Sequence, residues 1–206
     1  MGPKAALKKI WFFLWEEDSV WSWIANVILA FLIIKFLLYP GLGFFLGTPA
    51  PIVAVVSGSM EHDGNFDHFW SEPMCCNSVC SRKEVQGSYY ENLNITRAQF
   101  RDYDFANGFN KGDIIVLYSP KSSEVGDVIV YVVPNRPEPI IHRVIEKSEE
   151  NGKLFWTKGD HNCETGDFEQ HIPDNRVIGK AVWRVPLLGW VKIFAVWLLG
   201  SVTGGF

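Results

Sequence analysis

The sequence predicts a mainly β domain that follows one membrane-spanning helix near the N-terminus. From residue 112 onward, short aliphatic segments alternate with turns rich in glycine, proline, asparagine and aspartate. The same part of the chain lacks the long helical periods that an alternating strand-helix-strand arrangement needs. Residues 20–38 are mostly apolar and contain Lys35 as their one charged residue, and about 20 such residues cross a bilayer as a helix.

The apolar segment 20–38 is predicted to remain as a membrane anchor. No small-residue cleavage site follows it promptly, and it is longer than the core of a typical signal peptide. The sequence Tyr39-Pro40-Gly41 is predicted to end the helix, because proline and glycine disfavour helix interiors. Lys35 lies near one end of the segment, where a lysine reaches the lipid headgroups, and we assign it no function.

The residues around this segment predict its orientation. Basic residues before it favour a cytoplasmic N-terminus, which places the rest of the chain outside: Lys4, Lys8 and Lys9. Four tryptophans gather near its start, as is typical of membrane–water interfaces: Trp11, Trp15, Trp21 and Trp23. The formal net charge of −4 indicates no broad basic surface, so nucleic acid is not expected as a partner.

Cysteine usage agrees with an oxidising compartment. The chain has four cysteines, three of them close together: Cys75, Cys76, Cys80 and Cys163. We expect disulfides of open connectivity and no metal, because the cluster lacks paired Cys-x-x-Cys spacing and a close histidine. No cofactor is expected. Asn94-Ile95-Thr96 is a glycosylation sequon whose use stays open.

Composition divides the chain into three parts. Residues 1–46 hold the cytoplasmic N-terminus, the anchor and an apolar connector. Residues 47–186 form the extracytoplasmic β domain, within which the polar and aromatic segment 61–111 is predicted as an inserted loop or cap. Residues 187–206 are apolar apart from Lys192. We predict a second membrane-associated element there, either a span or a segment lying in the headgroup layer.

Turn residues separate the strands predicted for the β domain. The predicted strands cover 114–118, 128–133, 140–145, 154–157 and 177–185. Two of them follow a Gly-Asp pair, and Asp113 and Asp127 are expected to shape those turns and not to take part in catalysis, because aspartate bonds its own backbone two residues on.

Several short boxes in a fixed order carry a family resemblance. They are Pro51-Ile52-Val53-Ala54-Val55-Val56-Ser57-Gly58-Ser59-Met60, Gly112-Asp113-Ile114-Ile115-Val116, Gly126-Asp127-Val128-Ile129-Val130-Tyr131, Ile140-Ile141-His142-Arg143-Val144 and Thr157-Lys158-Gly159-Asp160. The set resembles the type I signal peptidase family, in its archaeal and endoplasmic-reticulum branch, where histidine replaces the bacterial lysine. The resemblance covers residues 52–185 and implies a signal-peptidase-type antiparallel β-sheet catalytic domain.

The resemblance implies that Ser59, directly before the methionine, is the nucleophile and that His142 is its general base. A serine hydroxyl needs a neighbouring base to attack at neutral pH, and a neutral imidazole can accept the proton. The partner of the second imidazole nitrogen stays open between two aspartates. We favour Asp167 as that partner and Asp160 as the group that shapes the site, although relatives usually have a gap one residue shorter between them.

The same resemblance implies how the substrate is held. Ser57 is expected to complete the oxyanion hole together with the backbone N–H of Ser59. An extended substrate can add to a sheet edge with alternate side chains in pockets. The candidates for lining those apolar pockets are Ile52, Val53, Val55 and Ile141. For each of them, packing in the core is an equally good interpretation.

The predicted function is a membrane-bound serine endopeptidase that cleaves signal peptides from exported preproteins. The expected partners are those signal peptides, membrane lipid, and the translocon or other subunits. The expected location is the cell membrane or the endoplasmic reticulum. Two alternatives stay open, a self-processing protease on the same scaffold and a non-catalytic membrane-anchored assembly module.

Overall fold

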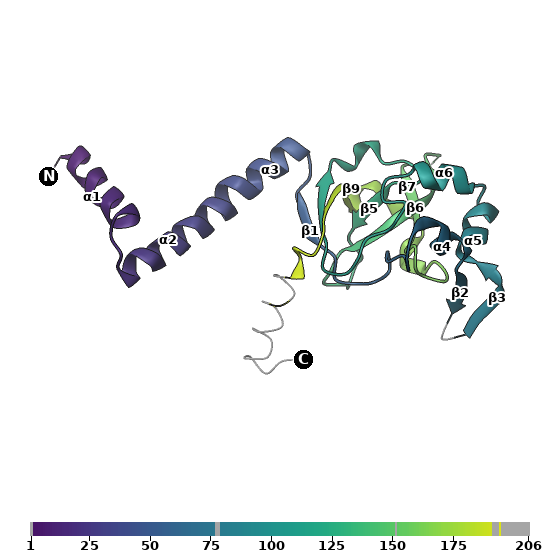
Figure 1. Ribbon diagram of the computed structural model, residues 1–206. Helices are drawn as coiled ribbons and strands as arrows, with labels where there is room; N and C mark the ends of the chain where they lie inside the picture. Colours follow the sequence, from purple (N-terminus) through teal and green to yellow (C-terminus); the bar gives the residue numbers. More distant parts are fainter. Residues whose placement is uncertain (1, 77–78, 151, 191–193, 195–206) are drawn as a thin grey trace. The chain divides into compact units, whose positions relative to one another are not determined.

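The computed structural model describes residues 2–76, 79–150, 152–190 and 194, with the backbone alone over 75–76 and 79–83. The chain divides into two units, with the boundary between Phe45 and Leu46. The first unit is helical and the second is built around a β-sheet (Figure 1). The prediction of a mainly antiparallel β fold behind one apolar helix is confirmed.

The first unit contains two helical segments joined by a turn. Helix α1 covers Pro3–Trp15, and α2 covers Val20–Ile33. The helix continues from α2 through a π-helical turn, Ile34–Leu38, into α3, Tyr39–Leu46. Together Val20–Leu46 make 27 residues with a mean hydropathy of 2.2, long and apolar enough to cross a membrane.

The prediction that Tyr39-Pro40-Gly41 ends this helix is wrong. Pro40 lies in the first turn of α3, directly after the π-helical turn. A proline inside an α-helix removes one hydrogen bond and clashes with the carbonyl four residues earlier. A wider π turn before the proline changes that pairing, so the helix continues to Leu46.

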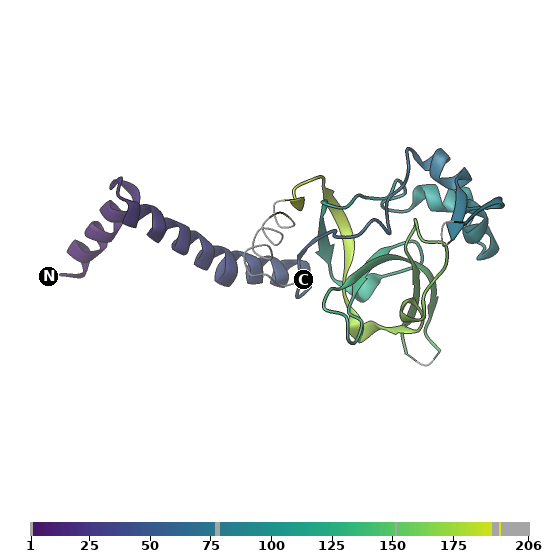
Figure 2. The same ribbon diagram turned by 90° about the horizontal axis from the view of Figure 1, so that it is seen from below.

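The second unit contains a seven-stranded antiparallel sheet in the order β1-β4-β9-β5-β6-β7-β8. Its strands are β1 (Ile52–Ala54), β4 (Ile114–Tyr118), β5 (Val128–Tyr131), β6 (Ile140–Ser148), β7 (Leu154–Lys158), β8 (Ile172–Pro173) and β9 (Val177–Val185). The strands curl around one another, as Figure 2 shows. Long β9 joins the two halves because it pairs with both β4 and β5.

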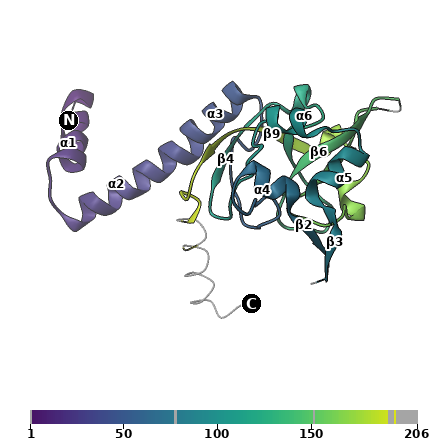
Figure 3. The same ribbon diagram turned by 45° about the vertical axis from the view of Figure 1, so that its right-hand side comes forward.

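The segment 61–111 is a structured insertion and not a plain loop. It contains α4 (Phe66–Ser71), α5 (Gln86–Asn92), α6 (Arg97–Asp102) and a hairpin of β2 (Pro73–Cys76) with β3 (Val79–Val85). Figure 3 shows its helices beside β6. Aromatic side chains form its own core, which packs against Ile145 of β6 and Trp156 of β7. The buried residues of this core before β6 are Phe66, Phe69, Trp70, Tyr90, Ile95 and Phe100.

Two predictions fall largely outside the described residues. Of the predicted membrane element 187–206, only 187–190 and 194 are described. The side chains of the clustered cysteines Cys75, Cys76 and Cys80 also lie outside the described part. Cys163 is disulfide-bonded. The disulfide connectivity therefore stays a prediction.

Candidate active site

Ser59 lies in a tight turn a few residues after the end of β1. The backbone N–H of Glu61 donates to Gly58 O and closes this turn at 3.0 Å. The backbone N–H of His161 donates to Ser59 O at 2.9 Å, and this bond connects the turn to the loop after β7. The buried side chain of Met60 anchors the turn in the core. The serine is thus held by its neighbours while its own side chain stays half-exposed.

His142 faces Ser59 from the middle of the sheet. Its Nε2 lies 2.9 Å from Ser59 Oγ, which is hydrogen-bond distance. Strand β6 pairs with β5 so that His142 is opposite Ile129, and the imidazole is buried between neighbouring strands. Ser57 Oγ lies 3.2 Å from Ser59 Oγ. The predicted nucleophile, base and second serine therefore meet in space, although 83 residues separate Ser59 from His142.

Glu169, and not Asp167, contacts the other imidazole nitrogen. Glu169 Oε1 lies 2.5 Å from His142 Nδ1, although the two groups are not aligned as a hydrogen bond. The Glu169 side chain is buried, whereas Asp167 is exposed at the start of the same short 3₁₀ turn, Asp167–Glu169. The expectation that Asp167 would face His142 is therefore corrected by the structure.

The turn itself explains why a glutamate reaches the imidazole. Gly166 N donates to Glu169 Oε2 at 2.6 Å, and Glu169 N donates back to Gly166 O at 2.9 Å. This reciprocal cap directs the carboxylate inward. The sequence signal for it is the spacing of Gly166 and Glu169, which places a carboxylate three residues after a turn residue. The sequence-based expectation considered Asp160 and Asp167 as partners of His142 and did not include Glu169.

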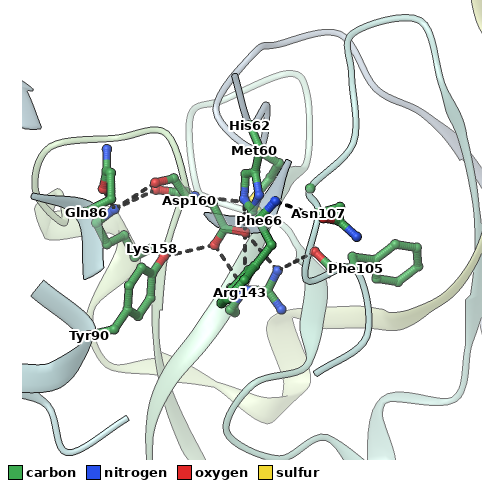
Figure 4. Close-up of polar contacts among 12 residues, drawn as sticks. Met60, His62, Phe66, Gln86, Tyr90, Phe105, Asn107, Arg143, Lys158 and Asp160 are labelled. Carbon is green, nitrogen blue, oxygen red and sulfur yellow. Dashed lines mark hydrogen bonds and ion pairs between the residues drawn. The ribbon is translucent and has the colours of Figure 1, made fainter. Parts of the chain in front are cut away.

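Asp160 occupies a different, fully buried site (Figure 4). Arg143 Nη2 donates to Asp160 Oδ2 at 2.8 Å, and the Tyr90 hydroxyl donates to Oδ1 at 2.9 Å. His62 Nε2 lies 2.9 Å from Oδ2. Burial by itself raises the pKa of Asp160, but the Arg143 charge and the bonds from Arg143 and His62 hold that pKa well below its ordinary value.

Arg143 and Asp160 contact the backbone segments that carry His142 and Ser59. Arg143 directly follows His142 in β6, and it also donates to the carbonyls of Asp104 and Phe105 in the insertion. Asp160 N donates to Met60 Sδ at 3.4 Å, next to Ser59. The placement agrees with the expected shaping role of Asp160. His62 and Tyr90, which the sequence interpretation left aside, complete this group.

Lys158 is the other charged residue buried beside this group. Its Nζ donates to the carbonyls of Gly159 and Asp160, each at 3.1 Å, and to Gln86 Oε1 at 3.3 Å. Burial lowers the pKa of Lys158 to about 8, against the attraction of Asp160 and Glu169. These bonds direct the lysine toward the loop after β7 and the insertion, and the contact with Ser59 is made by His142.

A pocket of about 560 Å³ opens beside Ser59 and His142. Its lining comes from the end of β1, the loop before β6, β6 itself and the turn with Phe168, and comprises Ala54, Val56, Ser57, Ser59, Arg136, Pro137, Glu138, Pro139, Ile140, Ile141, His142, Asn162 and Phe168. Among the predicted lining residues, Ile141 is in this set. Val55 is buried in the core, and Val53 packs against it.

Strand alternation explains which residues line the pocket. Successive side chains of a strand point to opposite faces. Val53 and Val55 therefore face the core, while Ala54 and Val56 face the pocket. Ile52 shares the outer face of the strand with Ala54 but is not part of the pocket lining. The core interpretation was correct for Val53 and Val55.

The arrangement is suited to nucleophilic attack on a carbonyl group. A hydroxyl next to an imidazole whose second nitrogen contacts a buried carboxylate is the geometry of a serine hydrolase triad, whatever the order of its members in the sequence. The pocket is lined mostly by apolar and small side chains beside the hydroxyl. An extended peptide with small side chains fits such a lining.

Comparison with known proteins identifies relatives. A scan against models of protein families finds no match to this chain. The chain is similar to "Signal peptidase complex catalytic subunit SEC11" of Plasmodium falciparum, 31% identical over 46% of this chain and 59% of the relative. It is similar to the protein of the same name from Colletotrichum graminicola, 27% identical over 82% of this chain and 79% of the relative. The protein of that name from Yarrowia lipolytica is 25% identical, over 77% and 71% respectively.

Proposed function

We propose that the chain is a member of the type I signal peptidase family, in its endoplasmic-reticulum branch, and that it is a membrane-anchored serine endopeptidase that removes signal peptides from preproteins. One observation carries this proposal. His142 contacts Ser59 with one imidazole nitrogen and Glu169 with the other. Its Nε2 lies 2.9 Å from Ser59 Oγ, and its Nδ1 lies 2.5 Å from Glu169 Oε1. This group lies beside the pocket that we propose for the peptide.

Each member of this triad has one role. His142 removes the proton from Ser59 as the hydroxyl attacks the scissile carbonyl, and it returns that proton to the leaving amine. Glu169 holds the imidazole in place and stabilises the imidazolium that forms. Ser57 and the backbone N–H of Ser59 are proposed to stabilise the oxyanion. Water then hydrolyses the acyl-enzyme on Ser59, with His142 again as the base.

The substrate segment is proposed to lie in the pocket formed by Ala54, Val56 and Ile141. These side chains leave room for small residues, such as the alanines that precede the cleavage site of signal peptides. The apolar helix Val20–Leu46 would hold the enzyme in the membrane that contains the substrate. The relatives are named catalytic subunits of a complex, and we extend the expectation of further subunits to this chain.

The test is cleavage of a membrane-inserted preprotein by purified protein and by two serine variants. Ser59→Ala should lower the rate by roughly 10⁴-fold or more, because the attacking oxygen is lost. The matched control Ser122→Ala changes an exposed serine and should cleave as the unmodified chain does. Circular dichroism verifies folding of both variants. Cleavage by a folded Ser59→Ala variant at the rate of the control would overturn the proposed function.

A further inference from the structure

Helix α1 carries an apolar stripe that protein does not cover. Leu7, Ile10, Trp11 and Leu14 follow the i, i+3, i+4, i+7 spacing of one helix face. In the part of the chain that the structure describes, 72% of Leu7, 56% of Ile10 and 61% of Trp11 are exposed. Such exposure on a stripe of large side chains indicates a surface that is covered by something other than this chain.

The other side of α1 carries two lysines. At 100° per residue, Lys8 and Lys9 fall on the arc away from Leu7 and Ile10, together with Ala5 and exposed Phe12, whereas Lys4 lies beside Trp11 at the edge of the stripe. The residues that follow α1, Glu16-Glu17-Asp18, form the turn to α2 and are exposed. An apolar stripe opposite lysines is typical of helices that lie flat in the headgroup layer of a membrane.

Two side chains of α2 fix the end of α1. Ser22 Oγ donates to Phe13 O at 2.6 Å, and Asn26 Nδ2 donates to Leu14 O at 2.7 Å. Ser22 and Asn26 are one helical turn apart, and they satisfy consecutive carbonyls that a helix end leaves unpaired. An amide inside an apolar span costs free energy unless it is hydrogen-bonded, and this bond to α1 provides the partner.

This contact also sets the depth of α1. The carbonyls of Phe13 and Leu14 lie beside the first two turns of α2, the point where the apolar helix begins. Figures 1 and 3 show α1 bending sharply away from the line of α2. The bend keeps α1 from continuing the span. It therefore runs across the start of the span at the level of the interface.

We propose that α1 is an interfacial helix that binds the lipid surface around the anchor. Its stripe of Leu7, Ile10 and Trp11 lies at the boundary between headgroups and acyl chains, and its lysines contact lipid phosphates. The lipid surface is the fitting partner because the stripe is followed in the same unit by an apolar span, and because Lys8 and Lys9 lie on the arc away from the stripe. This proposal does not depend on peptidase activity.

The test is nitroxide scanning of α1 in the full chain, reconstituted in bilayers with and without anionic lipid. Single added cysteines at positions 4 to 12 carry the label, and the unmodified chain treated alike gives the background. Collision with oxygen should peak at Leu7, Ile10 and Trp11, whereas collision with a water-soluble nickel complex should peak at Ala5 and Lys9. The two profiles should alternate out of phase with a helical period.

Three other results would overturn the proposal. Uniform nickel accessibility means that α1 lies in water, and uniform oxygen accessibility means that it lies within the hydrocarbon. Exclusion of both reagents from the stripe means that a protein, either a second copy or another subunit, covers it. Each result is read without measuring cleavage, so it leaves the proposed function untouched.

A pair of variants tests the link to the span. Asn26→Leu removes the donor to Leu14, whereas Val27→Leu changes a neighbouring exposed residue of α2 and keeps that donor. A label at Phe12 should become at least about twofold more mobile in Asn26→Leu than in Val27→Leu, because the end of α1 loses its partner. Equal mobility in the two variants would refute the fixing role of Asn26.

Discussion

Glu169 and Asp167 differ by two positions in one turn, yet only one of them contacts His142. The 3₁₀ turn from Gly166 directs the longer glutamate side chain inward, while Asp167 at its start faces solvent. Geometry, and not residue type, therefore decides which of the two carboxylates lies against His142.

The assignment of Glu169 predicts an order of activity. Glu169→Gln keeps the size of the side chain but removes the charge that stabilises the imidazolium, and turnover should fall by up to about 10⁴-fold. Asp167→Asn, in the same turn, should keep nearly full turnover because its side chain is exposed. Turnover and melting temperature of the two variants check this. Severe loss in Asp167→Asn with activity kept in Glu169→Gln would return the role to Asp167.

Asp160 should determine stability in acid. Its pKa is lowered in the fold, so its contribution to the free energy of unfolding is complete above the ordinary value of about 3.9 and is lost as the pH falls below it. Asp160→Asn leaves Arg143 buried without its anion, which should cost about 3–5 kcal/mol at neutral pH.

Urea denaturation at pH 7 and at pH 3 measures both parts of this prediction. The variant should be much less stable than the unmodified chain at pH 7, and the difference should shrink at pH 3. Asp67→Asn, which removes an exposed and ion-paired carboxylate, is the matched control and should change little. An equal loss of stability at both pH values would contradict the linkage to Asp160.

At the scale of elements, the segment formed by β1 and the two residues after it contributes alternate side chains to the core and to the pocket. Val55 is 1% exposed and packs with Met60 and Ile115. Val56, the next residue, lines the pocket beside Ser59. The insertion also contributes to both the core and the site. Its aromatic core packs on β6 and β7, and its Tyr90 hydroxyl donates to Asp160. Along this segment, alternate residues therefore pack in the core and line the pocket.

This division predicts opposite effects for two adjacent substitutions. Val55→Ala leaves a cavity in the core and should cost roughly 2 kcal/mol of stability, with little change in KM for a peptide substrate. Val56→Phe narrows the pocket and should lower kcat/KM several-fold, with an unchanged free energy of unfolding. Denaturation and steady-state kinetics of both variants check it. A core-like loss of stability from Val56→Phe would show that Val56 faces the core and not the pocket.

At the scale of the whole molecule, the described contacts fall into two units, a helical one and a β one. The three hydrophobic clusters consist of residues after Leu46, so the β unit has a core of its own. The helical unit has instead exposed apolar side chains along α2 and α3, as expected of a segment whose solvent is lipid. The apolar helix and the pair of Ser59 and His142 therefore belong to separate units of the chain.

The predicted orientation places the start of α1 in the cytoplasm and the β unit on the other side. Cysteines added singly at Ala5 and Ser122 report on each side in sealed vesicles whose cytoplasmic face is outward. A membrane-impermeant thiol reagent should label the Ala5 site at once and the Ser122 site only after detergent, because one span separates them. The unmodified chain gives the background. Labelling of Ser122 in sealed vesicles with Ala5 protected would invert the topology.

The sequence by itself determined the features that follow from local patterns. Alternating aliphatic segments and their turns predicted β4, β6, β7 and β9 nearly at their observed bounds. The apolar run predicted where the membrane helix begins, at Val20. The boxes around Ser59 and His142 predicted two side chains that the fold brings to 2.9 Å.

Only the tertiary structure decided the features that depend on segments meeting in space. The continuation of the helix past Pro40 depends on a π turn, which no residue pattern announced. The core of the insertion formed from scattered aromatics without strand or helix periodicity. The choice of Glu169 depends on the path of a loop around β6, because a carboxylate acts on an imidazole through distance and direction and not through its position in the sequence.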